Sequence, residues 1–311
     1  MVPITNLLLS SCPELIININ GDAVEMVEER SVAVRDLRMR YLDWGGNGEP
    51  VLALHGLASS ANWYDTVAPL LQNNFRVIAP DQRGHGQTTQ APSGYDWDSL
   101  ASDAIGLLDQ LGIEKAAVLG HSWGGNVAVN VAAKFPERTS SLVMIDGGFF
   151  SPMIIPGATW EQFQARLAPR DISGTRESYL NKMSVSLSMC WSDEIARILL
   201  TMVDEDNDGQ IHDILRPEHH AQVISAMWND PASETWSHIT CPTLIVPAGP
   251  MPERAGSEFA AMRRKMVEMA NEAISDSQVY WVPETIHDIG WHKPEELAGI
   301  IQSFLNSNQK T

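Results

Sequence analysis

One segment restricts the possible folds of this chain more than any other. The apolar run at residues 116–119 is followed by Gly-His-Ser-Trp-Gly at 120–124, and residues 125–134 have the composition of a helix. A strand that turns sharply into a helix, with a serine at the turn, is the form of a nucleophile elbow. The two glycines permit a close turn that a Cβ would block. We therefore predict that Ser122 stands exposed at the positive end of a helix.

Short apolar runs recur along the chain and alternate with helical stretches. The runs predict buried strands at 51–54, 76–79, 116–119, 141–145, 243–246 and 278–282. Helices are predicted at 63–71, 97–111, 257–273 and 294–304. This alternation indicates an α/β fold, with a mostly parallel central sheet flanked by helices on both faces. The alternating residues 32–44 predict an antiparallel pair of strands at the edge of that sheet.

The alternation is interrupted between residues 151 and 237. This block contains helical stretches and no obvious buried strand, which predicts an inserted helical cap. Residues 26–150 and 238–311 then form one core domain, and residues 1–25 form an N-terminal leader without periodicity that can be disordered. The cap predicts a mainly apolar pocket because of its aromatic residues and methionines, which are Trp160, Trp191, Trp228, Trp236, Met153, Met183, Met189, Met202 and Met227.

The charge balance limits the possible partners. The 311 residues include 39 acidic and 21 basic side chains, a net charge of −18. Like charges repel, so nucleic acid and anionic membranes are not expected partners. A strongly anionic substrate is also disfavoured, although a local basic pocket could override the overall charge. We expect a small-molecule substrate, with a homodimer as one possible assembly. Three widely spaced cysteines and the absence of a long apolar run favour a cytoplasmic protein.

No metal or cofactor is expected. The acidic residues 204–209 imitate the start of a calcium loop, but the twelfth position is Leu215, where that loop needs a bidentate glutamate. His219 and His220 are adjacent and cannot share one helix face as two ligands would. The sequence also lacks the glycine-rich loops that bind dinucleotides or nucleotide phosphates.

A serine hydroxyl needs a base to become a nucleophile and needs donors for the oxyanion. The strongest candidate base is His287, on the loop after the last strand, which returns over the strand ends. The backbone amides of Leu57 and Trp123 are the candidate oxyanion donors. Residues beside these positions are predicted to form the substrate pocket, namely His55, Gly56, Trp63 and His121.

Several segments together resemble the α/β-hydrolase superfamily from about Val32 onward. They are His-Gly at 55–56, Asp-Gln-Arg-Gly-His-Gly at 81–86, the segment 120–125, Ile-His at 286–287 and Pro-Glu-Glu at 294–296. The resemblance implies a catalytic serine early in the chain and a histidine late, and it gives Asp81 and Arg83 an architectural role.

The acid of the implied triad departs from the usual pattern. Family members usually place an aspartate on the loop after the penultimate strand, and residues 248–253 contain no aspartate. Glu253 could serve there, or Asp146 could serve from the end of the strand after the elbow, as in some members. We favour Asp146 because it lies beside the elbow, and we expect Asp288 to make local contacts only.

The serine identity restricts the chemistry. Dehalogenases and epoxide hydrolases of this fold use an aspartate nucleophile, whereas a serine implies acyl transfer. We expect hydrolysis of a small-to-medium apolar carboxylic ester or lactone through an acyl-enzyme on Ser122. Alternatives on the same fold are hydrolysis of a carbon–carbon bond in a β-diketone-type substrate and a non-catalytic ligand-binding receptor. A cofactor-free haloperoxidase activity is a secondary expectation.

Overall fold

The computed structural model describes residues 16–17, 23–24 and 27–308, except positions 153, 154, 156 and 171. The strands β1 (Ile16–Ile17) and β2 (Ala23–Val24) form a short antiparallel pair. The rest of the predicted leader lies outside the described residues, as does Met153.

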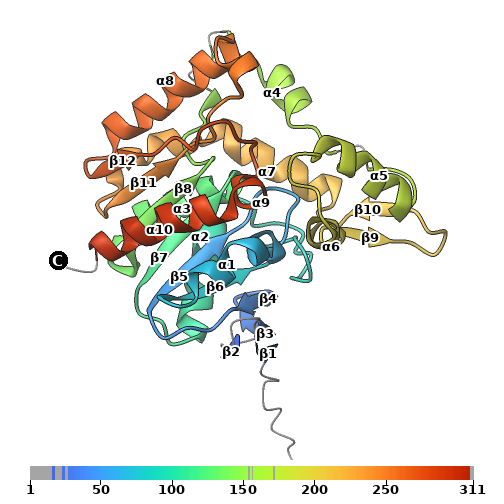
Figure 1. The fold of residues 1–311 in the computed structure, drawn as a ribbon, viewed down its shortest axis with the longest axis horizontal. Coiled ribbons are helices and arrows are strands. Elements are labelled where there is room, and N and C mark those ends of the chain that lie inside the picture. Colours follow the sequence, from blue (N-terminus) through green and yellow to red (C-terminus); the bar gives the residue numbers. More distant parts are fainter. Residues whose placement is uncertain are drawn as a thin grey trace, which may run out of the picture.

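The described chain is built around one eight-stranded sheet (Figure 1). Its spatial order is β12-β11-β8-β7-β5-β6-β4-β3. The strands β3 and β4 pair antiparallel at one edge, β4 is also antiparallel to β6, and all other neighbours are parallel. The sequence prediction of a mostly parallel sheet with an antiparallel edge is therefore confirmed. The strand bounds are β3 (Glu28–Val34), β4 (Leu37–Asp43), β5 (Glu49–Leu54), β6 (Phe75–Pro80), β7 (Ala116–His121), β8 (Thr139–Ile145), β11 (Thr243–Val246) and β12 (Ser277–Val279).

Helices cover both faces of the sheet. Successive residues of a strand point to opposite faces, so each face has its own buried cluster. Along β5, Leu52 and Leu54 join one buried cluster, and Val51 and Ala53 join the other. The first cluster packs against α2 (Trp97–Gln110), α3 (Trp123–Lys134) and α8 (Glu258–Ala273). The second packs against η1 (Ala61–Thr66), α1 (Ala68–Leu71), α9 (Ile289–His292) and α10 (Pro294–Asn308).

The described part of the insert, residues 151–237, contains four helices, in agreement with the predicted helical stretches. They are α4 (Trp160–Arg166), α5 (Arg176–Ser186), α6 (Asp193–Leu200) and α7 (Pro217–Asn229). Figure 1 shows α4 near the end of α8, and α5 and α6 farther out. Short 3₁₀ turns complete the chain: η2 (Pro136–Arg138), η4 (Ala232–Glu234), η5 (Trp236–His238) and η6 (Pro252–Arg254).

One hairpin in the insert was not predicted. The strands β9 (Val203–Glu205) and β10 (Ile211–Asp213) pair antiparallel, and each is only three residues long. Only Val203 and Ile211 of these strands are buried, so the apolar signal in the sequence is weak.

The acidic turn of this hairpin is held by its own side chains. Asp206 accepts hydrogen bonds from the backbone amides of Asp208 and Gln210, and its other oxygen lies 2.9 Å from Nε2 of His212. Gly209 has a φ of 73°, as expected of a glycine in such a turn. Among the described residues no group of three side chains is arranged to hold a metal ion. Nor does the described chain contain a helix with the length and apolarity needed to span a membrane.

Candidate active site

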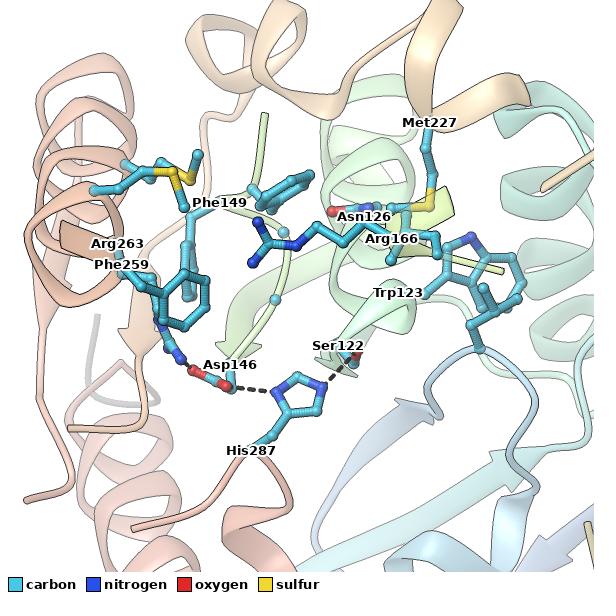
Figure 2. Close-up of a pocket in the computed structure, with 17 residues that line it drawn as sticks. Ser122, Trp123, Asn126, Asp146, Phe149, Arg166, Met227, Phe259, Arg263 and His287 are labelled. Atoms are coloured by element: carbon cyan, nitrogen blue, oxygen red, sulfur yellow. Dashed lines mark hydrogen bonds and ion pairs between the residues drawn. The ribbon is translucent and has the colours of Figure 1, made fainter. Parts of the chain in front are cut away.

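Ser122 lies in a sharp turn between β7 and α3 (Figure 2). Its φ is 53° and its ψ is −122°, a left-handed backbone that few non-glycine residues adopt. A Cβ on Gly120 would lie 2.2 Å from the carbonyl oxygen of Gly124, and one on Gly124 would lie 2.2 Å from that of Leu54. The predicted elbow is therefore present, and close packing of backbone requires both of its glycines.

Three side chains from distant segments form a hydrogen-bonded series at the carboxyl ends of the parallel strands (Figure 2). Nε2 of His287 lies 2.8 Å from Oγ of Ser122, and Nδ1 lies 2.5 Å from Oδ2 of Asp146. The carboxylate can only accept, so Nδ1 carries the proton. This tautomer leaves Nε2 free to accept the serine proton.

Asp146 follows β8 and is the most tightly held of the three hydrogen-bonded residues. Its side chain is 1% exposed, and its Oδ1 accepts a hydrogen bond from the amide of Ala248 and pairs with Arg263. Burial alone would raise the pKa of this carboxyl, but the hydrogen bond to His287 and the charges of His287 and Arg263 lower it below its usual value. Asp146 is therefore ionised at neutral pH.

The imidazole of His287 is half-exposed at the floor of the cavity. Partial removal from water lowers its pKa, but the hydrogen bond and the charge of Asp146 outweigh this effect. The resulting pKa lies above the usual 6.5, which suits a group that must take up a proton near neutral pH.

The two acids considered from the sequence have different surroundings. Asp146 contacts His287, whereas Glu253 is exposed in η6 and is not among the residues that line the cavity. Asp288 precedes α9, but its side chain does not cap that helix. It accepts a hydrogen bond at 2.9 Å from the indole of Trp63, 225 positions away, which corrects the expectation of local contacts.

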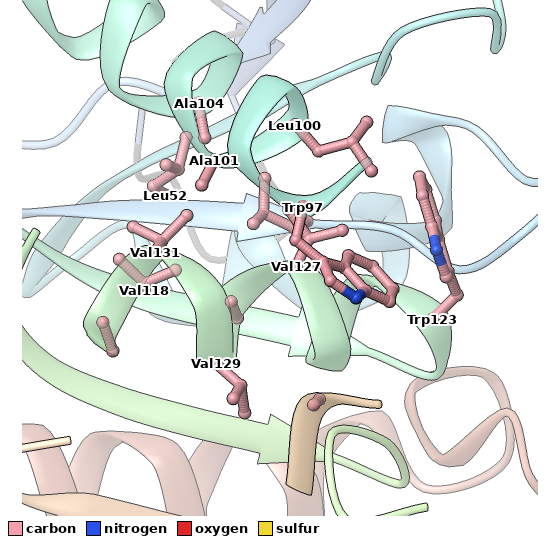
Figure 3. Packing of buried hydrophobic residues seen from close by; sticks show 14 of the residues in the cluster. Leu52, Trp97, Leu100, Ala101, Ala104, Val118, Trp123, Val127, Val129 and Val131 are labelled. Carbon is pink, nitrogen blue, oxygen red and sulfur yellow. The ribbon is translucent and has the colours of Figure 1, made fainter. Parts of the chain in front are cut away.

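The helix that follows Ser122 is anchored in the core (Figure 3). Val127 and Val131 of α3 belong to the same buried cluster as Leu100 and Ala104 of α2. Burying a valine or leucine side chain contributes about 1.5–3 kcal/mol. The elbow is thus supported by packing that fixes the position of Ser122.

A cavity of about 250 Å³ opens beside Ser122 and His287. Its polar lining also includes Asn126, Arg166 and Arg263. The apolar lining comes from β-strand ends, the insert and α8, and consists of Leu57, Trp123, Phe149, Phe150, Leu167, Met227, Phe259, Met262 and Met266.

The candidate oxyanion donors, Leu57 and Trp123, both line this cavity. Trp123 is the first residue of α3, and the N–H groups of a helix's first turn have no acceptor within the helix. Their role as donors to a developing oxyanion remains a prediction.

The four predicted pocket residues His55, Gly56, Trp63 and His121 do not line this cavity, which corrects the prediction. His55 is fully buried, where its Nδ1 donates to the carbonyl of Gly56 and its Nε2 accepts from the amide of Gln82. These bonds tie the loop after β5 to the loop after β6. The polar side chain of His55 therefore has a structural role.

Trp63 and His121 form a buried stack, with ring centroids 4.0 Å apart. Nε2 of His121 lies 3.2 Å from the carbonyl oxygen of His287, on the side of the elbow away from the cavity. Gly56 packs directly beneath the elbow, since a Cβ there would lie 3.2 Å from Cβ of Ser122. The sequence places these residues near the elbow but gives no information about which side they face.

The pocket is mainly apolar, as predicted from the sequence, but most of its apolar surface comes from residues other than those predicted. Of the tryptophans and methionines singled out in the insert that the structure describes, only Met227 lines the cavity. Trp160 and Trp228 pack against each other, and Met189 is 50% exposed. Met262 and Met266 come from α8 instead, and no local sequence signal assigns them to the pocket.

Asp81 and Arg83 have the expected architectural contacts. Asp81 pairs with Arg40 and accepts hydrogen bonds from the amides of Ala61 and Gln87. Arg83 pairs with Asp103 and with a second carboxylate on the β3–β4 turn, that of Asp36. Both side chains hold loops together at a distance from the cavity.

A mostly parallel sheet with this strand order, and with serine, histidine and aspartate at its strand ends, defines an α/β-hydrolase fold. The family model described as "alpha/beta hydrolase fold" matches residues 49–200. The chain belongs to the α/β-hydrolase superfamily.

Similar proteins have several activities. The chain is 38% identical over 112 residues to a "Serine hydrolase-like protein" of Danio rerio, a match that covers 35% of this chain and 34% of that protein. It is 35% identical over 122 residues to a "Soluble epoxide hydrolase" of Corynebacterium sp. (strain C12), covering 39% and 42% respectively. The chain thus spans less than half the length of these curated relatives.

Among solved structures, that of an "E-2-(Acetamidomethylene)succinate Hydrolase" superposes with a TM-score of 0.74 at 23% identity. This superposition covers 90% of this chain and all of that one. At this level of identity the likeness concerns the fold alone.

Proposed function

We propose that this protein is a serine hydrolase that cleaves a carboxylic ester or lactone through an acyl-enzyme on Ser122. The observation that carries the proposal is the hydrogen-bonded chain from Ser122 through His287 to Asp146 at the floor of a cavity. A serine is a weak nucleophile at its free pKa, and an adjacent base oriented by an acid activates it.

The steps follow from the positions of the three groups. Oγ of Ser122 attacks the carbonyl carbon while its proton moves to Nε2 of His287, and the amides of Leu57 and Trp123 stabilise the oxyanion. His287 then gives that proton to the departing alcohol oxygen. Water attacks the resulting acyl-enzyme, again with His287 as base, and the acid is released as Ser122 regains its proton.

The cavity supports a substrate of small to medium size. Its volume of about 250 Å³ lies just below the usual range of ligand pockets, about 300–1,000 Å³. Phenylalanine and methionine side chains dominate its wall, which favours an apolar body for the group bound there.

We further propose that the insert acts as a cap. Arg166 and Leu167 at the end of α4, and Met227 of α7, form part of the cavity wall. The core alone would leave that side open to solvent. Covering a reaction site excludes water and strengthens electrostatic interactions within it.

Intact-mass analysis after brief exposure to a fluorophosphonate tests the proposed nucleophile. We expect one adduct on the wild-type protein and none on Ser122→Ala. A folded wild-type protein without an adduct would contradict an activated serine and would favour a ligand-binding receptor.

A second panel tests the bond that is cleaved. It compares carboxylic esters and lactones with vinylogous diketones. Turnover confined to the diketones would replace the ester proposal with carbon–carbon bond hydrolysis.

A further inference from the structure

Two arginines reach the cavity from different parts of the chain. Arg166 ends α4 in the insert, and Arg263 lies within α8 of the core. Their Cζ atoms lie 5.1 and 5.9 Å from the centroid of the same ring, that of Phe259. Figure 2 shows the side chain of Arg166 extending sideways above Ser122 and His287 in this view.

The charges in this cavity do not balance. Asp146 is the only carboxylate in the described lining, and it is already paired with Arg263 and hydrogen-bonded to His287. Within the described chain, no ion pair to a carboxylate involves Arg166, whose guanidinium lies over the uncharged ring of Phe259. A cation without a carboxylate partner among the described residues is notable in a chain with 39 acidic and 21 basic residues.

Two buried polar groups in the same lining also lack partners. Asn126 is 4% exposed and Trp123 is 2% exposed. Neither Oδ1 of Asn126 nor Nε1 of Trp123 has a hydrogen-bond partner among the described residues. Leaving a buried polar group unpaired costs about 1–3 kcal/mol, and both residues belong to the cavity lining.

We infer that the cavity binds a substrate that carries a carboxylate, and that Arg166 forms the ion pair with it. A guanidinium matches a carboxylate with two parallel hydrogen bonds. The apolar part of the substrate packs on Phe149, Phe259 and Met262, while Asn126 bonds its remaining polar atoms. This inference rests on the proposed function and narrows it to monoanionic esters or lactones.

The inference reconciles the cavity with the overall charge of the protein. The net charge of −18 disfavours anions in general. Arg166 is itself exposed, but an ion pair at contact distance acts well within the Debye length, which is about 8 Å at physiological ionic strength. One carboxylate on an apolar body therefore fits this cavity better than a polyanion or a cation.

Matched substrate pairs test the role of Arg166. On the acyl side, mono-p-nitrophenyl adipate is compared with p-nitrophenyl hexanoate; on the alcohol side, 4-acetoxybenzoate is compared with phenyl acetate. We expect the wild-type protein to favour the anionic member of at least one pair in kcat/KM. Arg166→Gln should lower that anionic-to-neutral ratio about tenfold, mainly through KM.

Two variants serve as controls for this ratio. Arg166→Lys keeps the charge without the planar fork and should retain part of the preference. Arg264→Gln removes a positive charge from α8, at a side chain that bonds the carbonyl of Ala255 outside the cavity. It should leave the ratio unchanged. A wild-type preference for the neutral ester in both pairs, or an equal loss in Arg166→Gln and Arg264→Gln, would overturn the inference.

A binding measurement separates this inference from the proposed reaction. Calorimetric titration of Ser122→Ala with monomethyl adipate, which carries one carboxylate, should show binding that weakens about tenfold in Ser122→Ala/Arg166→Gln. Arg166-dependent binding without turnover of any ester would support the carboxylate subsite and refute the hydrolase proposal. Ester turnover that does not depend on Arg166 would support the hydrolase proposal and refute the carboxylate subsite. The absence of turnover and of Arg166-dependent binding would overturn both proposals.

Discussion

The two sides of the elbow contain histidines in opposite electrostatic situations. The rings of His287 and His121 lie 4.8 Å apart. On the cavity side, Asp146 raises the pKa of His287 above its usual value. On the buried side, loss of hydration lowers the pKa of His121 to about 4, with the neighbouring charge of His287 acting in the same direction. Access to water and a carboxylate partner, rather than residue type or proximity, distinguish a candidate base from a structural side chain.

The buried side extends this contrast to two more histidines. Burial lowers the pKa of His55 to about 4 and that of His85 to about 3, so both are neutral near pH 7. Nε2 of His85 accepts a hydrogen bond from the amide of Ala58. Neutral imidazoles can donate and accept at once, which lets each of these rings link two loops near the site.

Asp146→Asn removes the carboxylate partner of His287 on the cavity side of the elbow, and we expect the largest effect from this substitution. The amide can donate to Nδ1 of His287 and so favours the wrong tautomer. We expect kcat for the best ester substrate to fall on the order of 10⁴-fold, with the fold intact. Steady-state kinetics and circular dichroism measure the two properties.

The matched control for this substitution is Glu253→Gln. It removes the other candidate acid from the exposed η6 turn, and its kcat should stay within about twofold of the wild type. A large loss in Glu253→Gln together with a small one in Asp146→Asn would reverse the assignment of the acid.

His121→Ala should act on the buried side, through stability. The substitution removes the ring that stacks on Trp63 and leaves a cavity beneath the elbow. We expect the free energy of unfolding to fall by about 2 kcal/mol, as measured by urea denaturation. kcat should fall far less than in Asp146→Asn, and a loss as large would place His121 in the reaction itself.

The smallest expected effect concerns the pH dependence of kcat/KM, which tests the electrostatic difference between His287 and His121. The base must be neutral, so activity should fall as the pH drops through the raised pKa of His287, with an inflection above pH 6.5. The charge of Arg263 lowers this pKa. Arg263→Gln should therefore move the inflection to higher pH and reduce kcat/KM about fivefold at most at neutral pH.

A profile that does not move in Arg263→Gln would show that this arginine does not influence the base. The same titration should show no inflection near pH 4 attributable to His121, because that ring does not touch the reacting atoms. Arg264→Gln, on the same helix but outside the cavity, is the control for a general effect of net charge.

Much of the fold was readable from the sequence because its signals are local. The apolar runs of β5, β7 and β11 and the long helices α2, α8 and α10 lie within a few residues of their predicted positions. The hairpin β9–β10 was missed because two buried residues in strands of three residues give no clear alternation. Short elements depend on the surfaces that they meet.

The site was predictable only where chain order carries information. Ser122 is marked by its turn, and His287 by its place after the last strand. The contact between Asp146 and His287, 141 positions apart, and that between Asp146 and Arg263, 117 positions apart, depend on how the strand ends and α8 meet. The positions of Arg166 and of the methionines of α8 depend on the same tertiary packing.

The left-handed backbone at Ser122 has a consequence for the kinds of chemistry that this scaffold can acquire. At a φ of 53° a β-branched side chain is strongly disfavoured, so threonine is excluded as a replacement nucleophile although it carries the same hydroxyl. Unbranched cysteine and aspartate face a smaller steric barrier there. Single substitutions at this position can therefore replace the hydroxyl nucleophile by a thiol or a carboxylate. The backbone geometry of this one residue thus limits the reactions open to variants of this protein.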